Sequence, residues 1–82
     1  MYRETFYNFH PNIKAVVVKN IRKYRKMRGY TQEQLAFLSE ISYDFMRRIE
    51  SGKGEIGFSI QTLYKLKTAL DVSYDNLFEE EK

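Results

Sequence analysis

The sequence predicts an all-α fold of five short helices. Three observations predict it. Apolar residues recur at spacings of three and four in several segments. A Ser, Thr or Asn stands where each of these segments needs an N-cap, and glycines follow several of them. The chain is 82 residues long, which fits one domain, and without cysteine it has neither disulfides nor a thiolate metal site.

The first helix is expected over residues 13–28, with Asn12 as its N-cap and Gly29 as the left-handed residue after its end. Its apolar face is formed by Ile13, Val17, Ile21 and Tyr24. The preceding residues 1–12 have four aromatic side chains without a helical period, and they are expected to form an N-terminal arm.

The second helix is expected over residues 32–39. Thr31 and Gln34 have the spacing of a capping box, and Tyr30 stands where a hydrophobic staple would contact Leu35. The side chains expected to be buried are Leu35 and Leu38.

The last two helices also begin with serine. Ser59 is the N-cap of a fourth helix, and Ser73 is the N-cap of a short fifth helix over residues 74–78 that buries Leu77. The apolar face expected on the fourth helix consists of Ile60, Leu63, Leu66 and Leu70. The remaining residues 79–82 are expected to form an acidic tail, so that the folded domain covers residues 13–78.

The third helix begins after Ser42 and ends at Ser51, before Gly52. At about 100° per residue, Met46 and Ile49 point together and must be the buried side. The opposite side is polar and basic: Asp44, Arg48 and Ser51, flanked by Arg47 and Phe45, with Tyr43 in the first turn. This arrangement is typical of a recognition helix that enters the major groove of DNA.

The charge distribution favours the same interpretation. The net charge is only +3, but residues 14–53 contain ten basic and four acidic residues. A basic middle with an acidic end fits a surface that binds a polyanion. Lysines that only solvate helices are the alternative explanation.

The chain from Ile21 to Phe78 resembles the Cro/C1-type (XRE-like) helix-turn-helix family. The matching segments, in order, are Ile21-Arg22, Arg25, Arg28-Gly29, Thr31–Ala36, Ile41-Ser42, Ile49-Glu50, Gly52-Lys53, Thr62-Leu63, Ala69-Leu70 and Val72–Phe78. The resemblance implies a lambda-repressor-like domain of five helices that binds double-stranded DNA. The sequence differs from the family at Glu40, where a turn glycine is usual, and at Phe37 and Val18.

The resemblance also implies a role for individual residues. The positions that read bases in the family are occupied by Tyr43, Asp44, Phe45 and Arg48, and those that contact phosphates by Gln32, Arg47 and Lys53. Arg25 and Glu50 occupy the positions of an interior ion pair; a glutamate near a helix C-terminus independently needs a cation. Some alternatives stay open. Asp44 could instead only favour the helix dipole, Tyr43 could stack on the sugar-phosphate edge, and Phe45 could pack against the second helix.

The sequence therefore predicts a cytoplasmic, sequence-specific transcriptional regulator, a repressor that acts as a homodimer on a pseudo-palindromic operator. Candidate dimer residues are Tyr64, Tyr74, Phe78 and the aromatic arm. An antitoxin-type module, which binds a protein partner through Phe37 or the arm as well as its own promoter, is the alternative, as is a restriction–modification controller. No catalytic residue, cofactor, metal site or membrane span is predicted: His10 is the only histidine, and the longest apolar run is Ala15–Val18.

Overall fold

The computed structural model describes residues 12–52 and 57–80. In these ranges the fold is all-α, which confirms the predicted class, and no strand is present. The helices are α1 (Ile13–Met27), α2 (Gln32–Leu38), α3 (Tyr43–Ser51), α4 (Ile60–Leu70) and α5 (Tyr74–Phe78). The first two end one residue earlier than expected. Of the predicted arm over residues 1–12, all but the last residue lie outside the described ranges.

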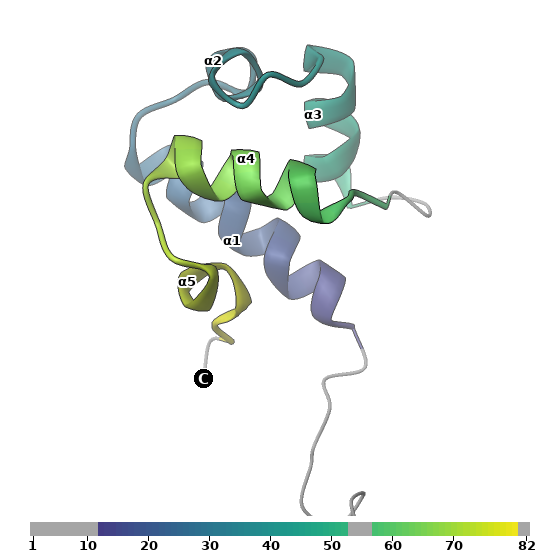
Figure 1. Cartoon of the computed structure of the whole chain (residues 1–82), viewed down its shortest axis with the longest axis vertical. Helices are drawn as coiled ribbons and strands as arrows, with labels where there is room; N and C mark the ends of the chain where they lie inside the picture. Colours follow the sequence, from purple (N-terminus) through teal and green to yellow (C-terminus); the bar gives the residue numbers. More distant parts are fainter. Residues whose placement is uncertain (1–11, 53–56, 81–82) are drawn as a thin grey trace, which may run out of the picture.

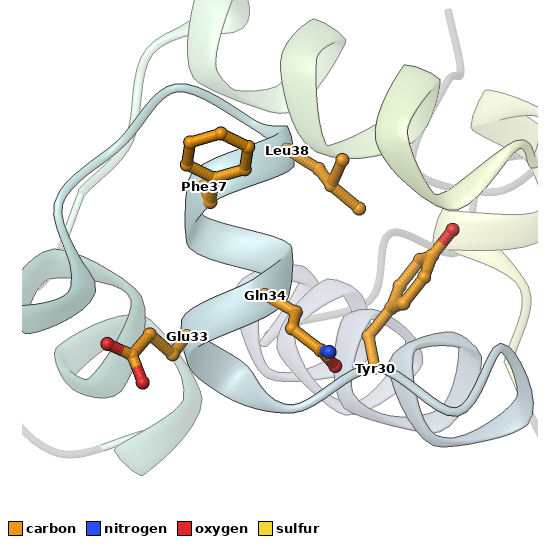
Figure 2. A pocket seen from close by; sticks show the side chains of 5 residues that line it. All are labelled: Tyr30, Glu33, Gln34, Phe37 and Leu38. Atoms are coloured by element: carbon orange, nitrogen blue, oxygen red, sulfur yellow. The ribbon is translucent and has the colours of Figure 1, made fainter.

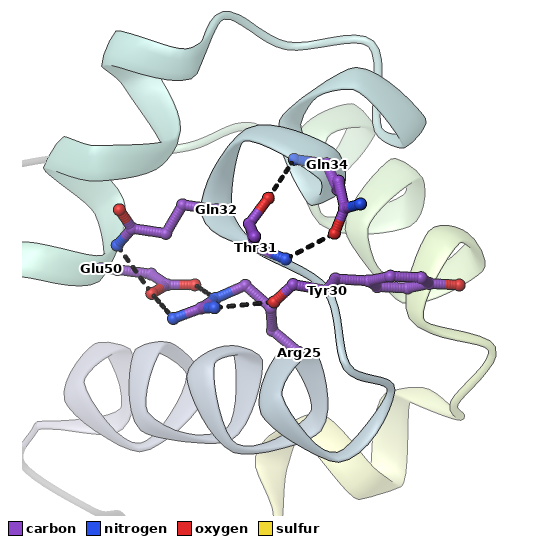
Figure 3. Close-up of polar contacts among 6 residues, drawn as sticks. All are labelled: Arg25, Tyr30, Thr31, Gln32, Gln34 and Glu50. Carbon is purple, nitrogen blue, oxygen red and sulfur yellow. Dashed lines mark hydrogen bonds and ion pairs between the residues drawn. The ribbon is translucent and has the colours of Figure 1, made fainter.

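Side chains at the predicted cap positions begin four of the helices. Thr31 Oγ1 accepts a hydrogen bond from the backbone N–H of Gln34 at 3.0 Å, and Gln34 Oε1 accepts one from the backbone N–H of Thr31 at 2.8 Å, which completes the capping box before α2 (Figure 3). Ser42 Oγ accepts from the N–H of Phe45 at the start of α3 in the same way. Asn12 differs, because no capping hydrogen bond from its side chain is formed.

The turn between α2 and α3 contains a non-glycine residue in the left-handed region. Glu40 has φ 58°, close to the 76° of Gly29 and the 67° of Gly52, which follow α1 and α3. A left-handed backbone costs an L-residue energy because its Cβ approaches the following carbonyl oxygen. Glu40 therefore adopts the left-handed conformation that the usual glycine would adopt without this cost, and the turn still places α3 against α2.

The core lies where α1, α3 and α4 meet α2 and α5 (Figure 1). Its buried apolar residues are Val17, Ile21, Leu35, Ala36, Met46, Ile49, Leu66, Leu70 and Leu77. Three residues expected on apolar faces are exposed: Ile13, the first residue of α1, is 41% exposed, Leu38 is 49% exposed and Ile60 is 83% exposed. Leu35, Ala36 and Ser39 occupy the inner side of α2, which turns Leu38 outward, and Ile60 lies at the first position of α4, before its packed turns.

Polar side chains of α1, one of them buried, join it to helices that are distant in the sequence. Asn20 of α1 is buried, and its Nδ2 donates to the carbonyls of Leu77 at 2.7 Å and Glu79 at 2.9 Å. Arg28 donates to the carbonyls of Leu70 and Asp71 at the end of α4. These bonds satisfy carbonyls that helix ends leave without partners. These hydrogen bonds attach α4 and α5 to α1. The helices α2 and α3 lie at the end of the molecule opposite to α5 (Figure 1).

Candidate functional site

The outward side of α3 is a polar and basic surface that the described residues 12–52 and 57–80 leave exposed. Met46 is completely buried and Ile49 is 1% exposed, so these two side chains fix which side of α3 faces the core. The opposite side carries the exposed residues Tyr43, Asp44, Arg47 and Arg48. The structure therefore brings four of the predicted DNA-contacting residues together on one accessible surface, here called the α3 surface.

Side chains on the α3 surface interact in pairs one helical turn apart. Arg48 Nε lies 3.3 Å from Asp44 Oδ2, with 59% of the Arg48 side chain and 70% of the Asp44 side chain exposed. The Arg47 guanidinium carbon lies 5.5 Å from the centre of the Tyr43 ring, within the range of a cation–π contact. Residues four apart on a helix are neighbours, which allows both contacts. One face of the Tyr43 ring is thus occupied, whereas Asp44 and Arg48 remain mostly in solvent.

Phe45 stands apart from the other predicted base readers. Its side chain is half-buried and packs against the hydrophobic core. This position agrees with an inward-packing role for Phe45, and its role as a base reader stays a prediction. Phe45 lies at the edge of the α3 surface.

A buried ion pair fixes α3 to α1 beneath this surface (Figure 3). Arg25 Nε donates to Glu50 Oε2 at 2.7 Å, and Arg25 Nη2 donates to Glu50 Oε1 at 2.9 Å. Two parallel bonds of this kind fix both position and orientation. The third nitrogen, Arg25 Nη1, donates to the carbonyl of Tyr30 at 2.9 Å, so the same guanidinium also holds the connection between α1 and α2.

Gln32 belongs to this buried network. Its Nε2 donates to Glu50 Oε1 at 3.0 Å, and the side chain is half-buried. The sequence placed Gln32 among phosphate-binding residues and gave no sign of this bond, which depends on how α2 lies against α3. Lys53, another expected phosphate contact, lies outside the described residues.

The outer side of α2 carries a feature that sequence reasoning found only in part. Tyr30, Glu33, Gln34, Phe37 and Leu38 line an open hollow of about 460 Å³ (Figure 2). Phe37 is 82% exposed, as expected for an apolar residue that replaces a polar one on the solvated side. The exposed Leu38 supplies the rest of the apolar lining of the hollow. The sequence pattern did not reveal the hollow, because it predicted that Leu38 is buried.

No group of three or more His, Cys, Asp or Glu side chains in residues 12–52 and 57–80 could hold a metal ion. No helix there is both long and apolar enough to cross a membrane.

A family model and a curated protein match most of this chain. The model of a family described as helix-turn-helix matches residues 21–77. A curated relative, the HTH-type transcriptional regulator SlrR of Bacillus subtilis (strain 168), is 39% identical over 61 residues. The match covers 74% of this chain and 40% of SlrR, so the chain spans less than half of the relative's length. No solved structure gives a significant match.

Proposed function

The chain belongs to the helix-turn-helix family, and from this premise we propose that it is a sequence-specific transcriptional regulator that binds double-stranded DNA in the cytoplasm. One observation carries the proposal: the α3 surface is polar, cationic and free of the protein, while the other side of α3 is packed into the core. The name of SlrR, a transcriptional regulator, supports the same function.

The proposed interaction places α3 in the major groove, where each base pair presents a distinct pattern of donors and acceptors. Arg48 contacts guanine through O6 and N7, with Tyr43, Asp44 and Phe45 as the other candidate readers of bases. The phosphate contacts come from Gln32, Arg47 and Lys53. Residues 14–53 contain ten basic and four acidic residues. This excess of positive charge attracts the negatively charged duplex and supports the phosphate contacts.

The proposed regulator is a repressor that acts as a homodimer on a pseudo-palindromic operator. Two copies of α3 would then enter the groove about 34 Å apart, one turn of the duplex. Support comes from exposed aromatic side chains on α4 and α5: Tyr64 at 55%, Tyr74 at 38% and Phe78 at 42% exposed. A two-fold interface needs one patch that is complementary to itself, and these residues are its candidates.

Selection of duplexes from a random pool by the purified chain tests the proposal. We expect the bound sequences to share a half-site, and titrations to fall steeply with salt. Arg48→Ala should reduce the preference for the selected base over other bases at one base pair by a factor of about 5 to about 150. Arg47→Ala is the matched control on the same helix: it should weaken all duplexes alike and reduce the salt slope by about one. Enrichment of no common half-site by the wild-type chain would contradict the function.

A protein-binding module of the antitoxin type is the second candidate, and the α2 hollow favours it. An apolar side chain as exposed as Phe37, beside a hollow, is a feature of interaction sites. The test is coexpression with the product of the neighbouring gene, followed by size-exclusion chromatography. Phe37→Ser should dissociate that complex and leave DNA titrations unchanged, because Phe37 lies outside the α3 surface. A complex that survives the substitution excludes this role for Phe37.

A further inference from the structure

The contact between Asp44 and Arg48 engages one particular nitrogen of the guanidinium. Asp44 Oδ2 lies 3.3 Å from Arg48 Nε, on the inner edge of the group. Among the described residues, no hydrogen bond from the two terminal amino groups of Arg48 accompanies this ion pair. The carboxylate thus holds one edge of a planar group and leaves the outer edge available.

That available edge is the one that guanine recognition needs. Guanine presents two neighbouring acceptors in the major groove, O6 and N7, and a guanidinium can donate to both in parallel. An unrestrained arginine side chain has many rotamers and can equally well contact a phosphate. An ion pair with Asp44 at Nε favours those rotamers of Arg48 in which the terminal amino groups extend beyond the carboxylate.

The charge of Asp44 adds a second effect. A carboxylate beside the groove is repelled by the phosphates, so it offsets part of the attraction that Arg48 has for any duplex. The ion pair is weak in water because both side chains are exposed, but the interaction is screened less once the groove excludes solvent. Asp44 therefore opposes binding where Arg48 finds no guanine.

From this geometry we infer that Asp44 is a positioning residue, which sets the base preference of the α3 surface through Arg48 and contacts no base itself. The inference rests on the proposed DNA-binding function. It differs from the role implied by the family resemblance, in which Asp44 reads a base directly. The two roles predict different outcomes when Arg48 is removed.

The experiment is a cycle of four proteins: the full chain, Asp44→Ala, Arg48→Ala and the double variant. Each is titrated against the selected half-site and against duplexes in which each base pair is replaced in turn. Asp44→Ala should bind unrelated duplexes more tightly, with a salt slope steeper by about one. It should also reduce the preference at the base pair read by Arg48, by roughly 2- to 10-fold. In the Arg48→Ala background, Asp44→Ala should change no base preference.

A conservative variant separates positioning from charge alone. Asp44→Glu can still reach Arg48 across one helical turn, and it should restore most of the preference that Asp44→Ala loses. Asp44→Asn, which keeps the shape and removes the charge, should not restore it. Because 70% of the Asp44 side chain is exposed, these variants should stay folded. Asp44→Ala and Asp44→Asn lose a favourable charge in the first turn of α3, so their melting temperatures should fall by only a few degrees.

Two results would overturn the inference. A base preference that changes when Asp44 is removed from the Arg48→Ala protein would make Asp44 a direct reader. An unchanged preference in the single Asp44→Ala variant would reduce the ion pair to a surface contact. Failure of the underlying function looks different, because the wild-type chain itself would then show no preference to alter.

Discussion

The buried pair between Arg25 and Glu50 leads to the sharpest prediction about stability. Arg25 is 9% exposed and Glu50 is 6% exposed, and each bonds through both of its facing polar atoms. Substitution of Glu50 by Leu leaves a buried guanidinium whose remaining partner is the Tyr30 carbonyl. Removal of one partner from a buried pair costs about 3–5 kcal/mol, because the other charge then lacks compensation. A domain of 82 residues has a total stability of roughly 4–12 kcal/mol, so the loss is a large part of it.

The double variant Arg25→Met/Glu50→Leu should recover most of that loss. Apolar residues of similar volume often replace a buried pair at little cost. Two hydrogen-bonding groups then lose a partner: the Tyr30 carbonyl and the half-buried Gln32 amide, which can turn toward solvent. We expect the double variant to lie within about 1–2 kcal/mol of the wild type. The coupling energy between the two positions should therefore be at least about 2 kcal/mol.

Urea unfolding followed by circular dichroism measures these differences. With an m-value of about 1–1.5 kcal/mol/M for a small domain, a loss of 3 kcal/mol or so moves the midpoint by about 2–3 M. A stabilising osmolyte in all four samples keeps the single variants folded if the wild type is near the lower limit. The reasoning is refuted if the double variant loses the sum of the single losses. Single losses below about 1 kcal/mol would also refute it, since they would mean that water reaches the pair.

Three further substitutions test single features of the fold. Ser39 Oγ is buried and has no hydrogen-bond partner in the described part of the chain, so Ser39→Ala should raise the free energy of unfolding by about 1 kcal/mol in urea titrations; a decrease would indicate a bound water. Glu40→Gly relieves the left-handed strain at φ 58° and should raise the melting temperature by a few degrees; no rise would mean that the lost contact with Lys65 at 3.8 Å matters more. Asn20→Ala removes the donor to two carbonyls at the end of α5, and hydrogen exchange should become faster there than in α3; equal rates would argue against local opening.

The sequence predicted those parts of the fold that depend on local chemistry. The cap residues Thr31, Ser42, Ser59 and Ser73 begin their helices as expected, because a side chain and the N–H three residues later are always close at a helix start. Met46 and Ile49 were also identified correctly as buried, since they are the aliphatic side chains of α3 and point to the same side. The contact between Arg25 and Glu50 is present as the family resemblance and the helix-dipole argument expected.

The parts that the sequence did not predict depend on contacts between helices. Leu38 follows the apolar pattern of α2, but the described helices leave 49% of it exposed. The Gln32 amide bonds to Glu50 because of the angle at which α2 meets α3, which no spacing reveals. Asp44 and Arg48 are four residues apart, a spacing that allows an ion pair on a helix. The spacing alone does not show whether the two charges are in contact. Which bases the α3 surface reads stays a prediction.

The network around Glu50 has a consequence for how the domain would meet its DNA. Its bonds join α1, the connection after it, α2 and α3 through Arg25, Tyr30, Gln32 and Glu50 (Figure 3). The angle between α2 and α3 is thus set before any encounter, and little of the binding energy is spent on ordering the protein. Where the protein surface and the duplex differ in curvature, the duplex must then bend to fit the protein. For the proposed homodimer, easily kinked pyrimidine–purine steps between the two half-sites would be favoured for that reason, even without contacts from side chains.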